Sequence, residues 1–196
     1  MEKDTRARIL DAAALIIRRD GLARATTRRI AKAAGCSEAL LYKYFPDKQE
    51  IFLRVLTERV PRVAAVDELI GVNDVRANLR LLIAQMLAFY QESFPMAASI
   101  FGDTALLDAH REGMRARGAG PHVPAALVAA YITAEQEAGR VRPEVDGDAV
   151  ARLLVGAALH EAFLANYRGE GLDAPEELAD RLVAAVLPAG TGPSED

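Results

Sequence analysis

The sequence predicts an all-α fold, and three observations support this prediction. Apolar residues recur at helical spacing along most of the 196 residues, and no strand-like alternation competes with them. Glycine and proline interrupt this pattern at the intervals typical of helix ends. Apolar residues make up 51% of the chain, so it can bury a core in one large helical domain or in two smaller ones.

The first predicted helix covers about residues 4–20, and Gly21 follows it as a stop signal. Its apolar stripe is surrounded by arginines and consists of Ile9, Ala12, Ala13, Ile16 and Ile17. One face of this helix is therefore expected to pack against the elements that follow.

A helix-turn-helix pattern over residues 26–45 constrains function more than any other segment. Its first half places Ile30, Ala33 and Ala34 on one face, and its second half places Leu41 and Phe45 on the same face of the next helix. Two short helices that share a small core are the arrangement of helix-turn-helix DNA readers.

The residues at the ends of these helices agree with this pattern. Thr26 and Ser37 are suitable N-caps, and Gly35 can adopt the left-handed conformation that ends the first helix of the pair. After Pro46, Asp47 and Glu50 have the spacing of a capping box that opens a fourth helix.

Helical patterns continue over about residues 74–93, 96–108, 123–138, 148–167 and 175–187, and Pro95 is expected to separate the first two. We therefore predict a helix-turn-helix DNA-binding domain of three helices over residues 1–47. A helical domain for ligand binding and dimerisation follows over residues 48–190, and residues 191–196 are expected to form a flexible tail.

The charges are distributed unevenly, although the net charge is only −4. Residues 1–50 carry 11 Lys or Arg against 7 Asp or Glu, and residues 51–196 carry 13 against 21. A basic head on an acidic body suggests that the head alone meets a polyanion. The single cysteine, Cys36, cannot form an internal disulfide, and no leader or membrane-spanning run is apparent. We expect a cytoplasmic protein without a membrane partner.

The sequence offers no positive support for catalysis. His160 and Glu161 lack the second histidine that a zinc-protease helix requires, and no phosphate-cradling glycine loop is present. We therefore predict that the protein is not an enzyme and uses no metal or cofactor. One alternative is a helical module whose head binds another protein in place of DNA.

The N-terminal 55 or so residues resemble the DNA-binding domain of the tetracycline-repressor-like (TetR) family of bacterial transcription regulators. The resemblance depends on an ordered set of residues, and the remaining three quarters of the chain carry no comparable signature. The set comprises Ile9-Leu10-Asp11-Ala12-Ala13, Gly21, Thr26, Arg28, Ile30-Ala31, Ala34-Gly35, Ser37, Leu41-Tyr42, Phe45-Pro46 and Lys48.

The resemblance implies a regulator, usually a repressor, whose body binds a small molecule and thereby releases DNA. Four positions depart from the common pattern of the family, namely Glu38, Ala39, Leu40 and Tyr44. These departures are expected to affect which operator sequence the head recognises.

The candidate DNA-binding residues separate into groups that contact phosphates and groups that contact bases. Hydroxyls and cations suit phosphates, apolar Ala39 and Leu40 suit thymine methyls, and Glu38 can accept from a cytosine amino group. For Tyr42 the alternative is partial core packing, and for Arg28 it is a solvated face. The full set is Thr26, Thr27, Arg28, Ser37, Glu38, Ala39, Leu40, Tyr42, Lys43, Tyr44 and Lys48.

A short recognition helix buries too little surface for specific binding, so we expect a homodimer on a near-palindromic double-stranded DNA operator. The last two helices have apolar faces that suit a four-helix interface, although both faces alternatively cover their own domain. A small, largely apolar effector is expected in the body, and a regulator without a ligand switch is the alternative. The candidate pocket residues, alternatively plain core or surface, are Met86, Tyr90, Phe94, Phe101, Met114, Tyr131, His160 and Phe163.

Overall fold

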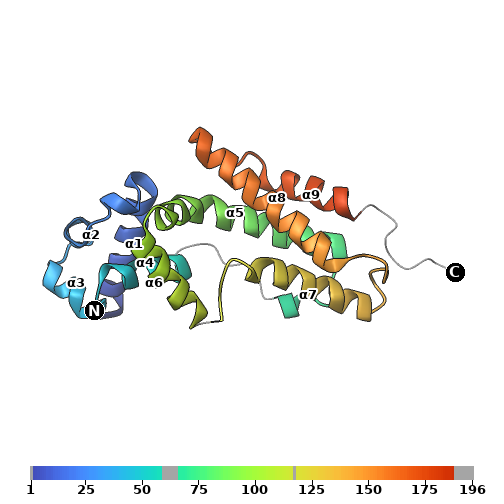
Figure 1. Cartoon of the computed structure of the whole chain (residues 1–196), viewed down its shortest axis with the longest axis horizontal. Coiled ribbons are helices and arrows are strands. Elements are labelled where there is room, and N and C mark those ends of the chain that lie inside the picture. The colour runs from blue at the N-terminus through green and yellow to red at the C-terminus, as the bar shows by residue number, and fades with distance from the viewer. Residues whose placement is uncertain (1, 59–65, 117, 188–196) are drawn as a thin grey trace. The chain divides into compact units, whose positions relative to one another are not determined.

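The computed structural model describes residues 2–58, 66–116 and 118–187 (Figure 1). Within these ranges the chain forms nine α-helices and no strand, which confirms the all-α prediction. The chain groups into two compact units, one from residues 1–60 with 92–119 and the other from 61–91 with 120–196. This grouping reflects packing, and the predicted functional division at residues 47 and 48 stays a prediction. The predicted tail, residues 191–196, lies outside the described residues.

The first unit begins with the elements predicted for the head. They are α1 (Glu2–Asp20), the 3-10 turn η1 (Leu22–Arg24), α2 (Thr27–Ala33), α3 (Glu38–Tyr44) and α4 (Lys48–Glu58). Each of the four α-helices contributes fully or almost fully buried apolar side chains, among them Ile9, Ile30, Leu41 and Ile51. The last part of α5 (Val75–Phe101) and the whole of α6 (Thr104–Arg115) complete this unit.

One detail of the predicted head core is wrong. Ala33 is exposed, and Ala31 is buried beside Ile30 and Ala34 in its place. Because α2 has only seven residues, a small rotation of the helix decides which alanine faces inward.

The second unit contains the 3-10 turn η2 (Val66–Glu68), the first part of α5 (Val75–Phe101), α7 (Val123–Glu137), α8 (Gly147–Arg168) and α9 (Pro175–Val186). Its core is one cluster of buried apolar side chains to which α5, α7, α8 and α9 all contribute, including Leu82, Tyr131, Leu154 and Val183. The predicted helices for residues 123–138, 148–167 and 175–187 are confirmed to within two residues.

The predicted helix break at Pro95 is wrong, because α5 runs through this residue and ends at Phe101. Proline has no N–H to donate to the carbonyl of Gln91, which would normally be costly inside a helix. The side chain of Asn166 donates its Nδ2 to this carbonyl at 3.2 Å and replaces the missing partner. The next helix begins after the break at Gly102, where Asp103 Oδ1 accepts the N–H of Leu106 at 3.0 Å.

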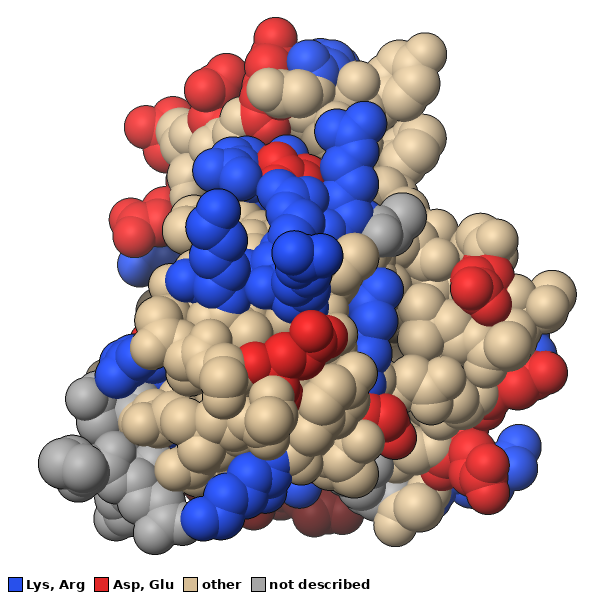
Figure 2. Space-filling model, turned by 90° about the vertical axis from the view of Figure 1, so that its left-hand side faces the viewer, with Lys and Arg blue, Asp and Glu red and all other residues tan. Residues whose placement is uncertain are grey.

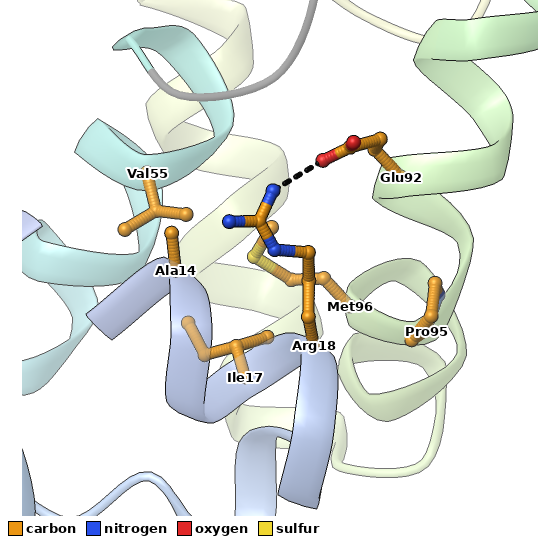
Figure 3. A pocket seen from close by; sticks show the side chains of 7 residues that line it. All are labelled: Ala14, Ile17, Arg18, Val55, Glu92, Pro95 and Met96. Carbon is orange, nitrogen blue, oxygen red and sulfur yellow. Dashed lines mark hydrogen bonds and ion pairs between the residues drawn. The ribbon is translucent and has the colours of Figure 1, made fainter. Parts of the chain in front are cut away.

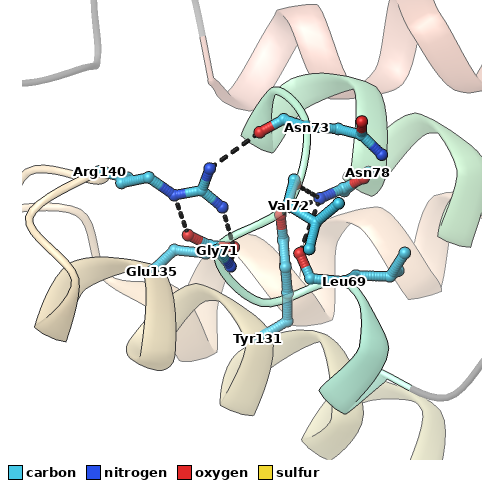
Figure 4. A network of polar contacts seen from close by, with 8 residues as sticks. All are labelled: Leu69, Gly71, Val72, Asn73, Asn78, Tyr131, Glu135 and Arg140. Atoms are coloured by element: carbon cyan, nitrogen blue, oxygen red, sulfur yellow. Dashed lines mark hydrogen bonds and ion pairs between the residues drawn. The ribbon is translucent and has the colours of Figure 1, made fainter.

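A buried polar network fixes the loop of residues 69–73 to α7 in the second unit (Figure 4). The Glu135 side chain is fully buried and accepts two hydrogen bonds of 2.6 Å from Arg140 and one of 3.2 Å from the N–H of Gly71. Arg140 also donates to the carbonyl of Asn73 at 2.8 Å. Burial by itself raises the pKa of Glu135, but the hydrogen bonds from Arg140 and Gly71 outweigh it, so the pKa is lowered.

Asn78 extends this network from α5. Its Nδ2 donates to the carbonyls of Leu69 and Val72 and to the hydroxyl oxygen of Tyr131, at 3.0, 2.6 and 3.0 Å (Figure 4). Burial raises the pKa of Tyr131 to about 12, so this hydroxyl stays protonated at neutral pH. The network therefore leaves the loop few alternative positions.

Candidate nucleic-acid interface

The turn between α2 and α3 has the geometry that the sequence predicts. Gly35 has φ of +66°, in the left-handed region that favours glycine. Arg8 of α1 holds the turn from outside, since its Nε donates to the carbonyl of Ala34 at 3.1 Å and its Nη2 donates to the carbonyls of Ala34 and Gly35. The angle between the two helices is thus fixed by the turn itself and by a cation from α1.

Both predicted caps of the helix pair are confirmed. The hydroxyl oxygen of Thr26 accepts the N–H of Arg29 at 3.3 Å, and that of Ser37 accepts the N–H of Leu40 at 3.1 Å. Each cap therefore satisfies one of the free N–H groups in the first turn of its helix. Asp47 similarly caps α4 by accepting the N–H of Glu50 at 2.7 Å.

One face of α3 is buried and the opposite face is open to solvent. Leu41 and Phe45 are at most 1% exposed and anchor the helix in the core of the first unit. Ala39, Tyr42 and Lys43 are exposed, whereas Leu40 and Tyr44 are half-buried. The exposed face is the part of this helix that can enter the major groove of DNA.

Three side chains on α2 and α3 are connected by hydrogen bonds. The hydroxyl of Thr27 donates to Glu38 Oε1 at 2.5 Å, and the hydroxyl of Tyr42 donates to the hydroxyl oxygen of Thr27 at 3.4 Å. Tyr42 is 48% exposed, which is compatible both with a contact to DNA and with the partial core packing considered as an alternative. An acidic group is thus held at the start of the recognition helix.

Lys and Arg side chains gather on the side of the molecule that carries α2 and α3 (Figure 2). Arg28, Lys32 and Lys43 are exposed and have no ion-pair partner among the described residues. Arg29 differs, because it forms an ion pair with Asp20 and donates to the carbonyl of Arg24 at 2.9 Å. The unpaired cations suit the phosphates of a duplex, since DNA supplies the missing counter-charges.

Lys48, one of the predicted DNA-binding residues, is half-buried at the start of α4. Its Nζ lies 4.9 Å from the ring centroid of Phe52 and donates to the carbonyl of Leu22 at 3.5 Å. Burial lowers the pKa of Lys48. Contact with a phosphate would require this side chain to leave the aromatic ring.

The predicted ligand-binding residues are divided between the two units. Phe94, Phe101 and Met114 belong to the first unit, and Phe101 is 69% exposed. In the second unit Met86 and Tyr131 are fully buried and Tyr90 is nearly so, all as members of the packed core. His160 and Phe163 are exposed on α8. These buried residues therefore belong to the packed core, which is the alternative that the sequence analysis considered.

A small hollow in the first unit is lined by none of these residues (Figure 3). Arg18 and Glu92 face each other at this site and form an ion pair of 2.6 Å. The other lining residues are Ala14, Ile17, Val55, Pro95 and Met96. The hollow leaves room for little more than a water molecule.

The described part of the chain contains no helix that is both long and apolar enough to cross a membrane.

The capped helix pair, its open outer face and the adjacent cations define a helix-turn-helix fold of the DNA-binding class. Residues 9–55 match the model of the family described as bacterial regulatory proteins, tetR family. The head of the chain therefore resembles the DNA-binding domain of this family.

Similarity to proteins of comparable length extends beyond the head. The chain is 27% identical to YdgC of Bacillus subtilis strain 168, an uncharacterised HTH-type transcriptional regulator, over 95% of both chains. A structure from Mesorhizobium loti MAFF303099, assigned to the TetR-family transcriptional regulators, has a TM-score of 0.73 at 20% identity and covers 95% of this chain and 96% of its own. FadR from Bacillus subtilis, solved in complex with stearoyl-CoA, has a TM-score of 0.68 at 17% identity and covers 93% of this chain and 97% of its own. These two structures share the fold of the whole chain.

Proposed function

We propose that this protein is a homodimeric transcriptional repressor that inserts α3 into the major groove of a near-palindromic operator. The observation that supports this most directly is the open face of α3, whose Ala39, Tyr42 and Lys43 are exposed while Leu41 and Phe45 fix the helix from behind. Affinity comes from phosphate contacts by the unpaired cations Arg28, Lys32 and Lys43. Ala39 and Leu40 supply apolar contacts to thymine methyls.

Salt titration tests the DNA-binding proposal. Duplexes selected from random DNA should lose affinity linearly with salt on logarithmic axes, because several phosphates release counter-ions. Lys43→Ala should lower affinity across sequences, and Leu40→Ala should mainly change the preferred bases. A flat salt response would instead favour a head that binds another protein.

Dimerisation is proposed through α8. Leu153, Leu159, Phe163 and Tyr167 form an exposed apolar stripe along this helix, with Leu153 at 61% and Tyr167 at 81% exposure. Gly156 lies on the same stripe, and a Cβ atom there would meet nothing within 4 Å, so a second backbone can approach. The apolar face of α9 mostly covers its own domain, since Val183 and Leu187 are buried in the core.

A matched pair of variants tests the dimer. Leu153→Lys should convert the dimer to a monomer in analytical ultracentrifugation at micromolar concentration. Leu15→Lys is the control, because Leu15 on α1 is similarly exposed, at 56%, but lies outside the stripe. A monomeric wild type, or a dimer that survives Leu153→Lys, would contradict this interface.

The effector is proposed to be a small, largely apolar molecule that binds the body and releases DNA. The concentration of methionine and aromatic side chains in the body and the stearoyl-CoA bound by FadR support this class of ligand. Long-chain acyl thioesters and free fatty acids should lower operator affinity at least about tenfold, which requires differential binding to the DNA-competent state. Operator affinity that is unchanged by the whole series would contradict this part of the proposal.

A further inference from the structure

We propose that Glu38 is a specificity-determining residue that opposes binding to DNA in general and favours a cytosine at the base position it faces. This inference deepens the proposed function and depends on it. Two consecutive hydrogen bonds, from Tyr42 to Thr27 and from Thr27 to Glu38, hold this acidic side chain at the start of α3.

The carboxylate of Glu38 is oriented by its neighbours. One oxygen, Oε1, accepts the hydroxyl proton of Thr27 at 2.5 Å, and the oxygen of that hydroxyl accepts from Tyr42 at 3.4 Å. Oε2 of Glu38 has no hydrogen-bond donor among the described residues, and the Glu38 side chain is exposed. A second donor can therefore be accepted without breaking the contact to Thr27.

The charge of Glu38 is not neutralised by a cation within the head. The described residues include no ion pair to this carboxylate, although Arg28, Lys32 and Lys43 lie on the same two helices. Near a duplex, an unpaired carboxylate is repelled by phosphates and by the acceptor atoms of guanine and thymine in the major groove. Adenine and cytosine both present an amino donor there, but the amino group of adenine lies beside the N7 acceptor, so cytosine offsets the repulsion best.

Thr27 connects this preference to the rest of the interface. A hydroxyl has a single proton, and Thr27 donates it to Glu38, so this hydroxyl has no proton left for a phosphate. Thr27 is thus a positioning residue for Glu38. The discrimination arises from a penalty on wrong sites as much as from a contact to the right one.

The test compares sequence preference and general affinity in the same full-length protein. Duplexes are selected from random DNA by the wild type, and affinities are then measured for the selected duplex, for duplexes with each half-site position altered, and for a scrambled duplex. The wild type should require a cytosine in each half-site and lose about fivefold or more in affinity when that base is replaced. Glu38→Ala and Glu38→Gln should remove this cytosine preference and raise affinity for the scrambled duplex about threefold.

Two further variants separate this role from a structural one. Thr27→Val removes the donor without changing the charge, and it should weaken the cytosine preference less than Glu38→Ala does. Lys43→Gln should lower affinity for all duplexes and leave the cytosine preference intact. Unfolding temperatures of all variants should match the wild type, because Glu38 and Lys43 are exposed and Thr27 is only half-buried.

The outcomes distinguish the role of Glu38 from DNA binding itself. A cytosine preference that persists in Glu38→Ala, or a scrambled-duplex affinity that does not rise in that variant, overturns the role of Glu38 while the DNA-binding proposal survives. A wild type that enriches no duplex overturns both.

Discussion

The ion pairs of the first unit lie at its surface, whereas the main polar network of the second unit is closed off from water. In the first unit, Arg6 donates to Glu58 at 2.7 Å and Arg18 to Glu92 at 2.6 Å, and all four side chains remain partly exposed. In the second unit, Glu135 is completely buried behind Arg140. The same kind of ion pair therefore has a different physical role in each unit.

Solvent decides this difference. Exposed ion pairs contribute little to stability because water and salt screen them, so the first unit depends on its turn, its caps and its apolar core. A buried carboxylate without its partner is strongly destabilising, so the second unit depends on an intact network. The head can therefore carry unpaired cations for DNA, while the loop of residues 69–73 is held firmly to α7.

The largest expected effect is loss of the buried network. Arg140→Ala should lower the free energy of unfolding by about 3–5 kcal/mol, because it leaves Glu135 charged and buried without its main partner. Urea denaturation measures this loss. Arg152→Ala is the control and should change stability by less than about 0.5 kcal/mol, since its 3.8 Å ion pair with Asp148 is exposed.

The double variant Arg140→Ala with Glu135→Gln sharpens this test. It removes the unpaired charge and should recover part of the loss, as a double-mutant cycle would show. If Arg140→Ala and its control Arg152→Ala lost equal stability, the contrast between the two units would be wrong.

A smaller effect is expected at the turn of the head. Gly35→Ala should destabilise the protein by about 1–2 kcal/mol, because its φ of +66° is unfavourable for a residue with a Cβ atom. That atom would also lie 3.2 Å from Nη2 of Arg8. At Gly171, where φ is not in this region and no atom lies within 4 Å, alanine should be neutral or stabilising in thermal unfolding. A neutral Gly35→Ala would show that the head tolerates other turn conformations.

The proline inside α5 gives an effect of about 1 kcal/mol. Asn166→Ala leaves the carbonyl of Gln91 without a donor and should cost about this amount in urea denaturation. In a Pro95→Ala background the helix supplies its own N–H, so the same substitution should cost clearly less. Identical costs in both backgrounds would disprove the replacement of the helical hydrogen bond by Asn166.

The smallest effect is the acid titration of Asp20. Hydrogen bonds from Arg19 and Arg29 lower the pKa of Asp20 to about 2, compared with 3.8 for the free group. The stability that this carboxylate contributes is therefore present above pH 3.8 and is lost as the pH falls toward 2. NMR titration of the Asp20 carboxyl measures this directly. A midpoint near 3.8 would show that the ion pair is not formed in solution.

The head was predictable from sequence because its signals are local. Thr26, Gly35 and Ser37 act on backbone groups within a few residues, so their roles follow from residue type and spacing. The prediction failed at Ala33, where a seven-residue helix contains too few apolar positions to fix its rotation.

The candidate site was predictable only in part. The sequence indicated which residues lie on the recognition helix, and their contacts with DNA remain predictions. The hydrogen bond between Thr27 and Glu38 joins residues 11 positions apart, and the contact of Lys48 with Phe52 depends on how α4 packs. Neither has a signature in residue spacing.

The sequence by itself determined the order of most helices, the helix-turn-helix pattern and the resemblance of the head to the TetR family, because caps, glycines and apolar periodicity act over short distances. Only the tertiary structure decided that α5 continues through Pro95 and that Glu135 is buried with Arg140. In the first case the decisive donor, Asn166, is 75 residues from the carbonyl it satisfies. Such compensation depends on which groups meet in space, and propensity along the chain contains no information about it.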